Sequence, residues 1–194
     1  TTPPIASRLV VPGSCQAWLV ASEHDPRKYA RPERERRFLL DRVPDGLGPP
    51  VHIRDRYLQG TRLRLRWFDG VDGTVRKLGQ KVRTDPDDPA EVWITNLYLD
   101  EDEYDRLVGL PAAVLEKDRY RWPAFGGSVD VFAGTLADLV LAEIECADDV
   151  AFRAVAAPPG ARADVTHDDR FSGGALAALD RRSLVILLGE LTGT

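Results

Sequence analysis

The feature that most restricts the fold of this chain is an alternation of charged and apolar residues with a period of two. In Leu63-Arg64-Leu65-Arg66 every second residue is basic, and in Leu141-Ala142-Glu143-Ile144-Glu145 two acids share one side of the pattern. Successive side chains of a β-strand point to opposite faces of its sheet, so such a segment has one charged face. The chain is therefore predicted to be built largely from strands that each carry charge on one side.

Turn and loop signals divide the chain into eight such strands. Asp69-Gly70 and Asp72-Gly73 are typical of a hairpin turn. Asp100, followed by Glu103, has the pattern of a helix capping box, and Ser172 precedes a final apolar stretch predicted as one helix. The predicted strands span residues 33–40, 51–58, 61–68, 74–82, 91–99, 114–120, 128–132 and 140–146, and the predicted final helix spans 175–191. Many short strands with few helices favour a β-rich α+β fold, either a barrel or a sandwich.

Length and composition exclude several classes of protein. The 194 residues suit one domain, which we place at 33–194, after a proline-punctuated leader at 1–32 with a short strand at 17–20. There is no apolar run of about 18 residues and no signal-peptide pattern, so we expect a cytoplasmic protein without a membrane partner. The net charge of −5 argues against broad nucleic-acid binding, and two cysteines form neither a disulfide framework nor a four-thiolate zinc site.

The charged faces of the strands are the candidate functional residues. Taken singly, each face is typical of a solvated strand. Taken together they favour a barrel, because several faces carry charges of one sign and could line one concave surface. That surface would hold eight bases against five acids, a surplus of three positive charges. The bases are Arg37, Arg62, Arg64, Arg66, Lys77, Lys81, Lys117 and Arg119, and the acids are Glu33, Glu35, Asp130, Glu143 and Glu145.

This mixture of charges suits phosphoryl chemistry. Phosphoryl transfer needs positive charge over the phosphate oxygens and a divalent metal held by carboxylates. Mg²⁺ binds one or two carboxylates together with waters and phosphate oxygens, and Mn²⁺ accepts the same oxygen ligands. Arginine grips phosphate through a two-pronged fork, whereas lysine acts as a compact point charge. The pattern therefore predicts a densely charged anion bridged to the carboxylates by Mg²⁺ or Mn²⁺.

Six segments, in order, resemble the motifs of the CYTH superfamily, also called the triphosphate tunnel metalloenzymes. Glu33-Arg34-Glu35-Arg36-Arg37 is similar to the signature Glu-x-Glu-x-Lys, and the match runs to about residue 180. The other five segments are Leu63-Arg64-Leu65-Arg66, Lys77-Leu78-Gly79-Gln80-Lys81, Lys117-Asp118-Arg119-Tyr120, Val129-Asp130-Val131-Phe132 and Leu141-Ala142-Glu143-Ile144-Glu145. The resemblance implies an eight-stranded antiparallel barrel with helices outside it and a linear triphosphate in its tunnel.

The resemblance also implies metal-dependent hydrolysis of inorganic tripolyphosphate or of an organic triphosphate. On this hypothesis Glu33, Glu35, Glu143 and Glu145 hold the metal, and Glu33, Glu35, Arg37 and Asp130 act in catalysis. The residues expected to bind phosphates are Arg62, Arg64, Arg66, Lys77, Lys81, Lys117, Arg119 and Arg170. The small-molecule triphosphate is the expected partner, and a homodimer is compatible with the sequence.

Two departures from the family pattern leave alternatives open. Arg37 stands where the signature has lysine, and the strand after the lysine motif, Trp93-Ile94-Thr95-Asn96-Leu97-Tyr98, lacks the acidic pair that the family often has there. A triphosphate-binding module with little turnover is therefore one alternative. A class IV-type adenylyl cyclase is another, in which a 3′-hydroxyl rather than water attacks phosphorus. Nucleic-acid binding is a fourth hypothesis, which the sequence disfavours because the bases are matched by acids on neighbouring strands.

Overall fold

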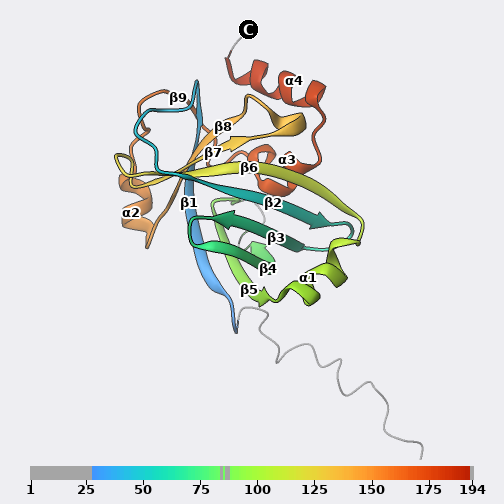
Figure 1. Ribbon diagram of the computed structural model, residues 1–194. Helices are drawn as coiled ribbons and strands as arrows, with labels where there is room; N and C mark the ends of the chain where they lie inside the picture. The colour runs from blue at the N-terminus through green and yellow to red at the C-terminus, as the bar shows by residue number, and fades with distance from the viewer. Residues whose placement is uncertain (1–27, 84, 86–87, 193–194) are drawn as a thin grey trace, which may run out of the picture.

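The computed structural model describes residues 28–83, 85 and 88–192, and its centre is a closed antiparallel barrel (Figure 1). The barrel confirms the predicted fold class. Its eight strands are β1 (Arg31–Leu40), β2 (Pro50–Leu58), β3 (Leu63–Gly70), β4 (Gly73–Arg83), β5 (Glu91–Leu99), β6 (Ala112–Trp122), β7 (Gly127–Phe132) and β8 (Val140–Glu145). Each predicted strand is present, and most begin or end one or two residues from the predicted bounds.

The first strand closes the barrel. The strands follow the order β5-β4-β3-β2-β6-β7-β8-β1, and β1 also pairs with β5. The start of β1 pairs with β5 through Arg31–Arg34, and its middle pairs with β8 through Glu35–Leu39. The end of β1 pairs with a short extra strand, β9 (Ala161–Asp164), which the sequence did not predict. A single ten-residue strand therefore holds the two edges of the sheet together.

The helices lie outside the strands or across one end of the barrel (Figure 1). Helix α1 (Glu101–Val108) has the predicted capping box, and its Tyr104 packs against Leu58 and Leu65 on the outer side of the barrel. The predicted single helix at 175–191 is wrong, because the structure divides it into α3 (Gly173–Ala177) and α4 (Arg181–Thr192). Asp180 separates them by accepting a hydrogen bond from the Ser183 amide at the start of α4. The remaining helical elements are α2 (Asp149–Ala154), η2 (Gly134–Leu136) and η3 (Asp169–Phe171).

An apolar cluster fills one end of the barrel, and we call it the plug. Leu39, Leu115 and Leu141 enter it from the strands, and it also contains Phe171, Leu176 and Leu184 from the helical segments that follow. Helix α3 approaches so closely that a Cβ on its Gly173 would lie 2.0 Å from the Tyr57 hydroxyl oxygen. Glycine at 173 thus allows α3 to seal this end, and the charged faces lie in the remaining part of the interior.

Two further predictions concern the N-terminal leader and the lack of a membrane-spanning segment. Of the predicted leader at 1–32, residues 1–27 and the predicted strand at 17–20 lie outside the described residues. Arg31 and Pro32 already belong to β1, so the first strand begins two residues before the predicted boundary. Within the described chain, no helix combines the length and the apolar character needed to cross a membrane.

Candidate functional site

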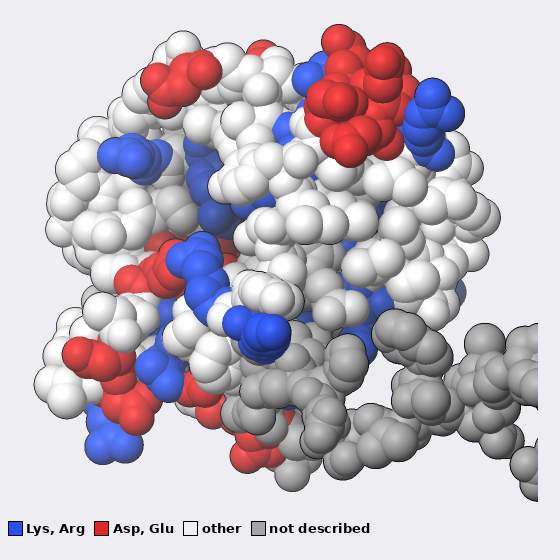
Figure 2. All heavy atoms as spheres, turned by 90° about the horizontal axis from the view of Figure 1, so that it is seen from below, with Lys and Arg blue, Asp and Glu red and all other residues white. Residues whose placement is uncertain are grey.

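The strand register brings the predicted charged faces together inside the barrel. Residues directly opposite each other in an antiparallel ladder point to the same face. The register pairs Arg37 with Glu143, Arg66 with Lys77, and Arg119 with Asp130. Viewed from the side opposite α4, the surface has a hollow with Lys and Arg atoms deep inside it and Asp and Glu atoms beside them (Figure 2). The charged alternation is therefore an interior lining and not a set of solvated faces.

Asp130 is the most deeply buried acid of this lining. Its carboxylate is 0% exposed and accepts hydrogen bonds from Arg119 Nε at 2.6 Å and Arg119 Nη2 at 2.7 Å. It also accepts one from the Lys117 ammonium, which is itself buried. Burial lowers the pKa of Lys117, and the charge of Asp130 partly offsets this effect. Asp130 therefore holds two of the predicted phosphate-binding cations in place.

Arg37 joins two acids from neighbouring strands. Its guanidinium donates to Glu35 and, from Nε, to Glu143 at 3.0 Å. Glu143 also accepts from Arg119. Burial alone would raise the pKa of Glu143, but the charges of Arg119, Lys117 and Arg37 hold it well below its usual range. A planar guanidinium can reach two carboxylates at once, which explains how arginine serves at the position where the family signature has lysine.

The structure adds an acid that the sequence analysis missed. Asp55 on β2 is 1% exposed and accepts two hydrogen bonds of 2.6 Å from the Arg66 guanidinium, with Arg64 Nε 3.8 Å away. Burial opposes ionisation of Asp55, yet the charge and hydrogen bonds of Arg66 and the charge of Arg64 hold its pKa well below its usual range. Its interior neighbours on β2 are Ile53 and Tyr57, so this strand lacks the run of like charges that marked the others.

The predicted interior position of Arg62 is wrong. It was predicted to share a strand face with Arg64 and Arg66, but it lies in the turn before β3 and is exposed. Placing Asp55 inside and Arg62 outside changes the interior count from eight bases and five acids to seven bases and six acids. The predicted surplus of three positive charges therefore falls to one.

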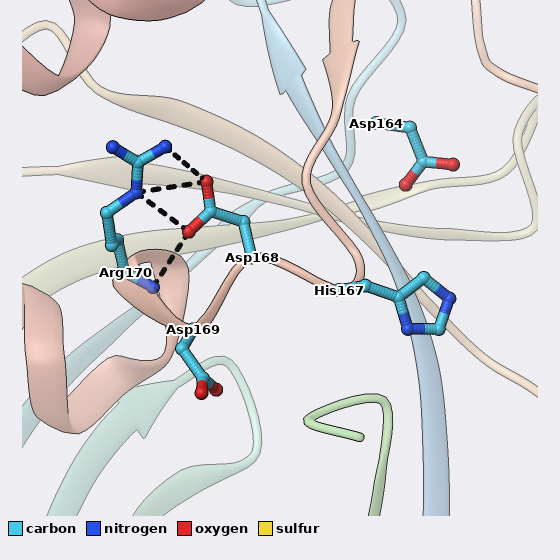
Figure 3. Close-up of a pocket in the computed structure, with 5 residues that line it drawn as sticks. All are labelled: Asp164, His167, Asp168, Asp169 and Arg170. Atoms are coloured by element: carbon cyan, nitrogen blue, oxygen red, sulfur yellow. Dashed lines mark hydrogen bonds and ion pairs between the residues drawn. The ribbon is translucent and has the colours of Figure 1, made fainter. Parts of the chain in front are cut away.

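Arg170 also lies away from the interior residues with which it was predicted to bind phosphate. It lies in η3, half exposed, where Asp168 accepts from its Nε at 2.9 Å (Figure 3). Glu190 on α4 accepts from its Nη1. These contacts hold its side chain among exposed acids and away from the interior cations. Figure 3 shows the surface pocket that Arg170 lines together with Asp164, His167, Asp168 and Asp169, and none of these five residues belongs to the interior lining.

The remaining acids lie where β1 meets β8 and β5. Glu35 and Glu145 are directly opposite in the ladder, Glu145 is paired with Arg31 at 3.3 Å, and Glu33 is paired with Lys81. Like charges in opposite positions destabilise a sheet unless a cation lies between them. No group of three or more potential metal ligands of the His, Cys, Asp and Glu types occurs within the described residues. The opposed carboxylates of Glu35 and Glu145 are two oxygen donors of the kind that Mg²⁺ takes when phosphate and water supply its other ligands.

Lys77 differs from the other interior cations because it forms no ion pair within the part of the chain that the structure describes. Burial, together with the charges of Arg66 and Arg64, lowers its pKa to about 8. Its ammonium lies 5.6 Å from the centre of the Phe68 ring. Lys77 is thus a cation available to an anionic ligand without breaking an existing salt bridge.

This position predicts a pH dependence of anion binding. Lys77 is charged below its pKa of about 8 and neutral above it, so we expect tripolyphosphate to bind more weakly as the pH rises from 7 to 9. A charge-assisted hydrogen bond contributes about 1.5–3 kcal/mol, and the charged fraction of Lys77 falls from about nine-tenths to about one-tenth over this range, so binding should weaken by roughly 5- to 10-fold. Calorimetric dissociation constants at several pH values would measure it. Lys77→Met should remove most of this pH dependence, and a variant with the wild-type dependence would contradict the assignment.

Comparison with known proteins links this lining to a hydrolase. No family model matches the chain. The inorganic triphosphatase of Nitrosomonas europaea is 32% identical over 157 residues, which are 75% of this chain and 96% of that protein. A crystal structure of the inorganic triphosphatase NE1496 superposes with a TM-score of 0.51 at 27% identity and covers 76% of this chain and 95% of its own. A second structure, of the hypothetical protein NE1496, gives 0.52 at 28% identity over 76% and 99% of the two chains.

Proposed function

The chain belongs to the family of the inorganic triphosphatase of Nitrosomonas europaea, and we propose that it is a metal-dependent triphosphatase whose reaction takes place inside the barrel. The observation that carries the proposal is the interior lining, in which seven bases from four strands face one space beside an apolar plug. A linear triphosphate is the simplest anion with phosphate oxygens at several points along such a lining. We also propose the CYTH superfamily as the wider group to which this family belongs.

The charge count supports a divalent metal. Each terminal phosphate carries about −1.5 to −2 charges near neutral pH. The interior surplus of one positive charge cannot neutralise a triphosphate, because most of its bases are already paired with acids. A divalent ion supplies the missing positive charge and polarises the phosphoryl oxygens. The requirement for Mg²⁺ or Mn²⁺ is therefore part of the proposal.

The carboxylates differ in their freedom to bind that ion. The Glu143 side chain is only 12% exposed and is paired with both Arg37 and Arg119, so we assign it to holding these two guanidinium groups. Glu35 and Glu145 lie opposite each other near the barrel end, and Glu33 follows on the same face of β1. We propose that Glu35 and Glu145 hold the metal and that Glu33 supports it. This differs from the earlier hypothesis, in which Glu143 was a ligand.

The interior residues then have separable roles in hydrolysis. Water attacks a terminal phosphorus, the bond from that phosphorus to the bridging oxygen breaks, and tripolyphosphate gives diphosphate and phosphate. Lys77 and Lys81 from β4 and Arg64 and Arg66 from β3 bind phosphate oxygens and stabilise the charge that develops on the departing diphosphate. Asp55 acts through Arg66 by fixing its orientation, and Asp130 does the same for Lys117 and Arg119.

A phosphate-release assay tests the proposed function. The full chain would be incubated with tripolyphosphate, ATP, GTP or thiamine triphosphate, each with Mg²⁺, with Mn²⁺ or with a chelator. We expect release from at least one of them, and release that stops when the metal is removed. Absence of release from all four, at high enzyme concentration and with either metal, would overturn the proposal.

A further inference from the structure

An apolar patch adjoins the cationic lining on the side away from the plug. Along β3 the interior residues run Arg64, Arg66 and then Phe68, and Arg64 lies opposite Tyr57, the tyrosine that contacts the plug. The next interior residue of β4 is Val75, which is opposite Phe68. On β5, Tyr98 is opposite Lys77. We call Phe68, Val75 and Tyr98 the rim.

The rim exposes aromatic surface next to Lys77, the interior cation that has no ion pair within the described residues. Tyr98 is 75% exposed, although it lies on the same strand face as the buried interior residue Ile94. Phe68 and Val75 are half-buried, and the Lys77 ammonium lies 5.6 Å from the centre of the Phe68 ring. A ligand whose phosphates reach Lys77 would therefore place whatever is attached to those phosphates against the rim.

Inorganic tripolyphosphate has no apolar group that could bind to such a surface, because all of its outer atoms are oxygens that interact with water or cations. A flat aromatic group gains from it, since stacking on an aromatic side chain stabilises a bound base by about 1–3 kcal/mol, or roughly 5- to 150-fold in affinity. We propose that the rim binds the aromatic group of an organic triphosphate, such as a nucleoside triphosphate, and that Tyr98 provides the stacking surface. This inference rests on the proposed function, because it assumes that the triphosphate occupies the lining.

The experiment compares three ligands that share phosphates and differ in what they carry. Tripolyphosphate has no organic group, ribose 5-triphosphate has a sugar without a base, and ATP has both. Dissociation constants would be measured by calorimetry, and phosphate release would be followed in parallel, for the wild-type chain and for Tyr98→Ala, Tyr98→Phe and Leu97→Ala. Leu97 is the matched control, because it is the exposed neighbour of Tyr98 on the outer strand face.

We expect wild type to bind ATP more tightly than ribose 5-triphosphate. Tyr98→Ala should raise the ratio of the ATP to the tripolyphosphate dissociation constant by about 5- to 150-fold. Tyr98→Phe should restore that ratio to within about threefold of wild type, and Leu97→Ala should leave it there. Thermal melting would confirm that all variants are folded.

The outcomes separate this inference from the proposed function. If wild type hydrolyses tripolyphosphate and the ratio does not respond to Tyr98→Ala, the rim does not bind a base and the inference is overturned alone. If ATP binds in a Tyr98-dependent manner but no triphosphate is hydrolysed, the rim is supported and the proposed hydrolase is overturned. Equal affinity of wild type for ATP and ribose 5-triphosphate also overturns the inference.

Discussion

Replacing Asp130 by asparagine is expected to lower the free energy of unfolding by about 3–5 kcal/mol. Asp130 is fully buried and is the shared partner of Lys117 and Arg119. Asparagine has nearly the same shape but no negative charge, so the variant would leave two cations without their counter-ion in a poorly hydrated interior. Breaking a buried pair from one side costs more than the pair contributes, because the remaining charge has no water to solvate it.

Urea denaturation followed by circular dichroism would measure this loss. The matched control is Asp118→Asn, since Asp118 lies between the two cations on β6 but points outward and pairs with exposed His52. Exposed pairs of this kind contribute at most about 1 kcal/mol, so the control should unfold close to wild type. A loss below about 1 kcal/mol in Asp130→Asn would mean that the interior is wetter than its burial indicates.

The strands were predictable because both sides of this barrel wall impose the same period of two. Where the interior face carried several like charges, as in Arg64 and Arg66 or Glu143 and Glu145, the pattern identified the strand and the inward face together. Helix α1 was predictable for a local reason, because the Asp100 and Glu103 capping box forms within four residues. Both signals depend on neighbours in sequence.

The residues that the sequence analysis misplaced depend on partners distant in sequence. No local sequence pattern identifies Asp55 as an interior residue, because its salt bridge is made to Arg66 on the next strand. Arg62 continues the alternation of Arg64 and Arg66, but the strand begins only at Leu63, and the turn carries it outside. For Asp55 and Arg62 no local pattern records these tertiary contacts. The break between α3 and α4 does have a local signal, because Asp180 accepts from the Ser183 amide three residues on, and the sequence analysis did not use it.

The interior cations differ in how strongly acids hold them, and we expect this difference to set the order in which they bind a triphosphate. Of the interior cations, Lys117 and Arg66 are held by fully buried acids, whereas Lys81 is paired with the less buried Glu33. Lys77 has no acid partner within the described part of the chain. On the proposed function, we expect an incoming phosphate to bind Lys77 without displacing an acid and then to compete with Glu33 for Lys81. We expect Glu33, once displaced, to be free to support the proposed metal beside the acids of β1 and β8.

Replacing Glu145 by glutamine is expected to raise the Mg²⁺ concentration for half-maximal activity by roughly 10- to 100-fold, because a carboxylate ligand is replaced by a weaker neutral one. Glu145 is the most informative acid for this purpose. Its only ion pair among the described residues is with Arg31, and both side chains are more than half exposed. The substitution should therefore change the free energy of unfolding by less than about 1 kcal/mol. Substitution of Glu35 or Glu143 would also disturb Arg37.

The control for Glu145→Gln is Glu116→Gln, because Glu116 forms a similarly exposed pair with Arg54 on the outer side of the barrel. Its Mg²⁺ dependence should match wild type. A second measurement, calorimetric binding of Mn²⁺ in the presence of a non-hydrolysable triphosphate analogue, reports the metal site without turnover. Weakened Mn²⁺ binding in Glu145→Gln and unchanged binding in Glu116→Gln would support the pair of Glu35 and Glu145. Equal binding in both variants would place the metal elsewhere in the lining and return Glu143 to consideration as a ligand.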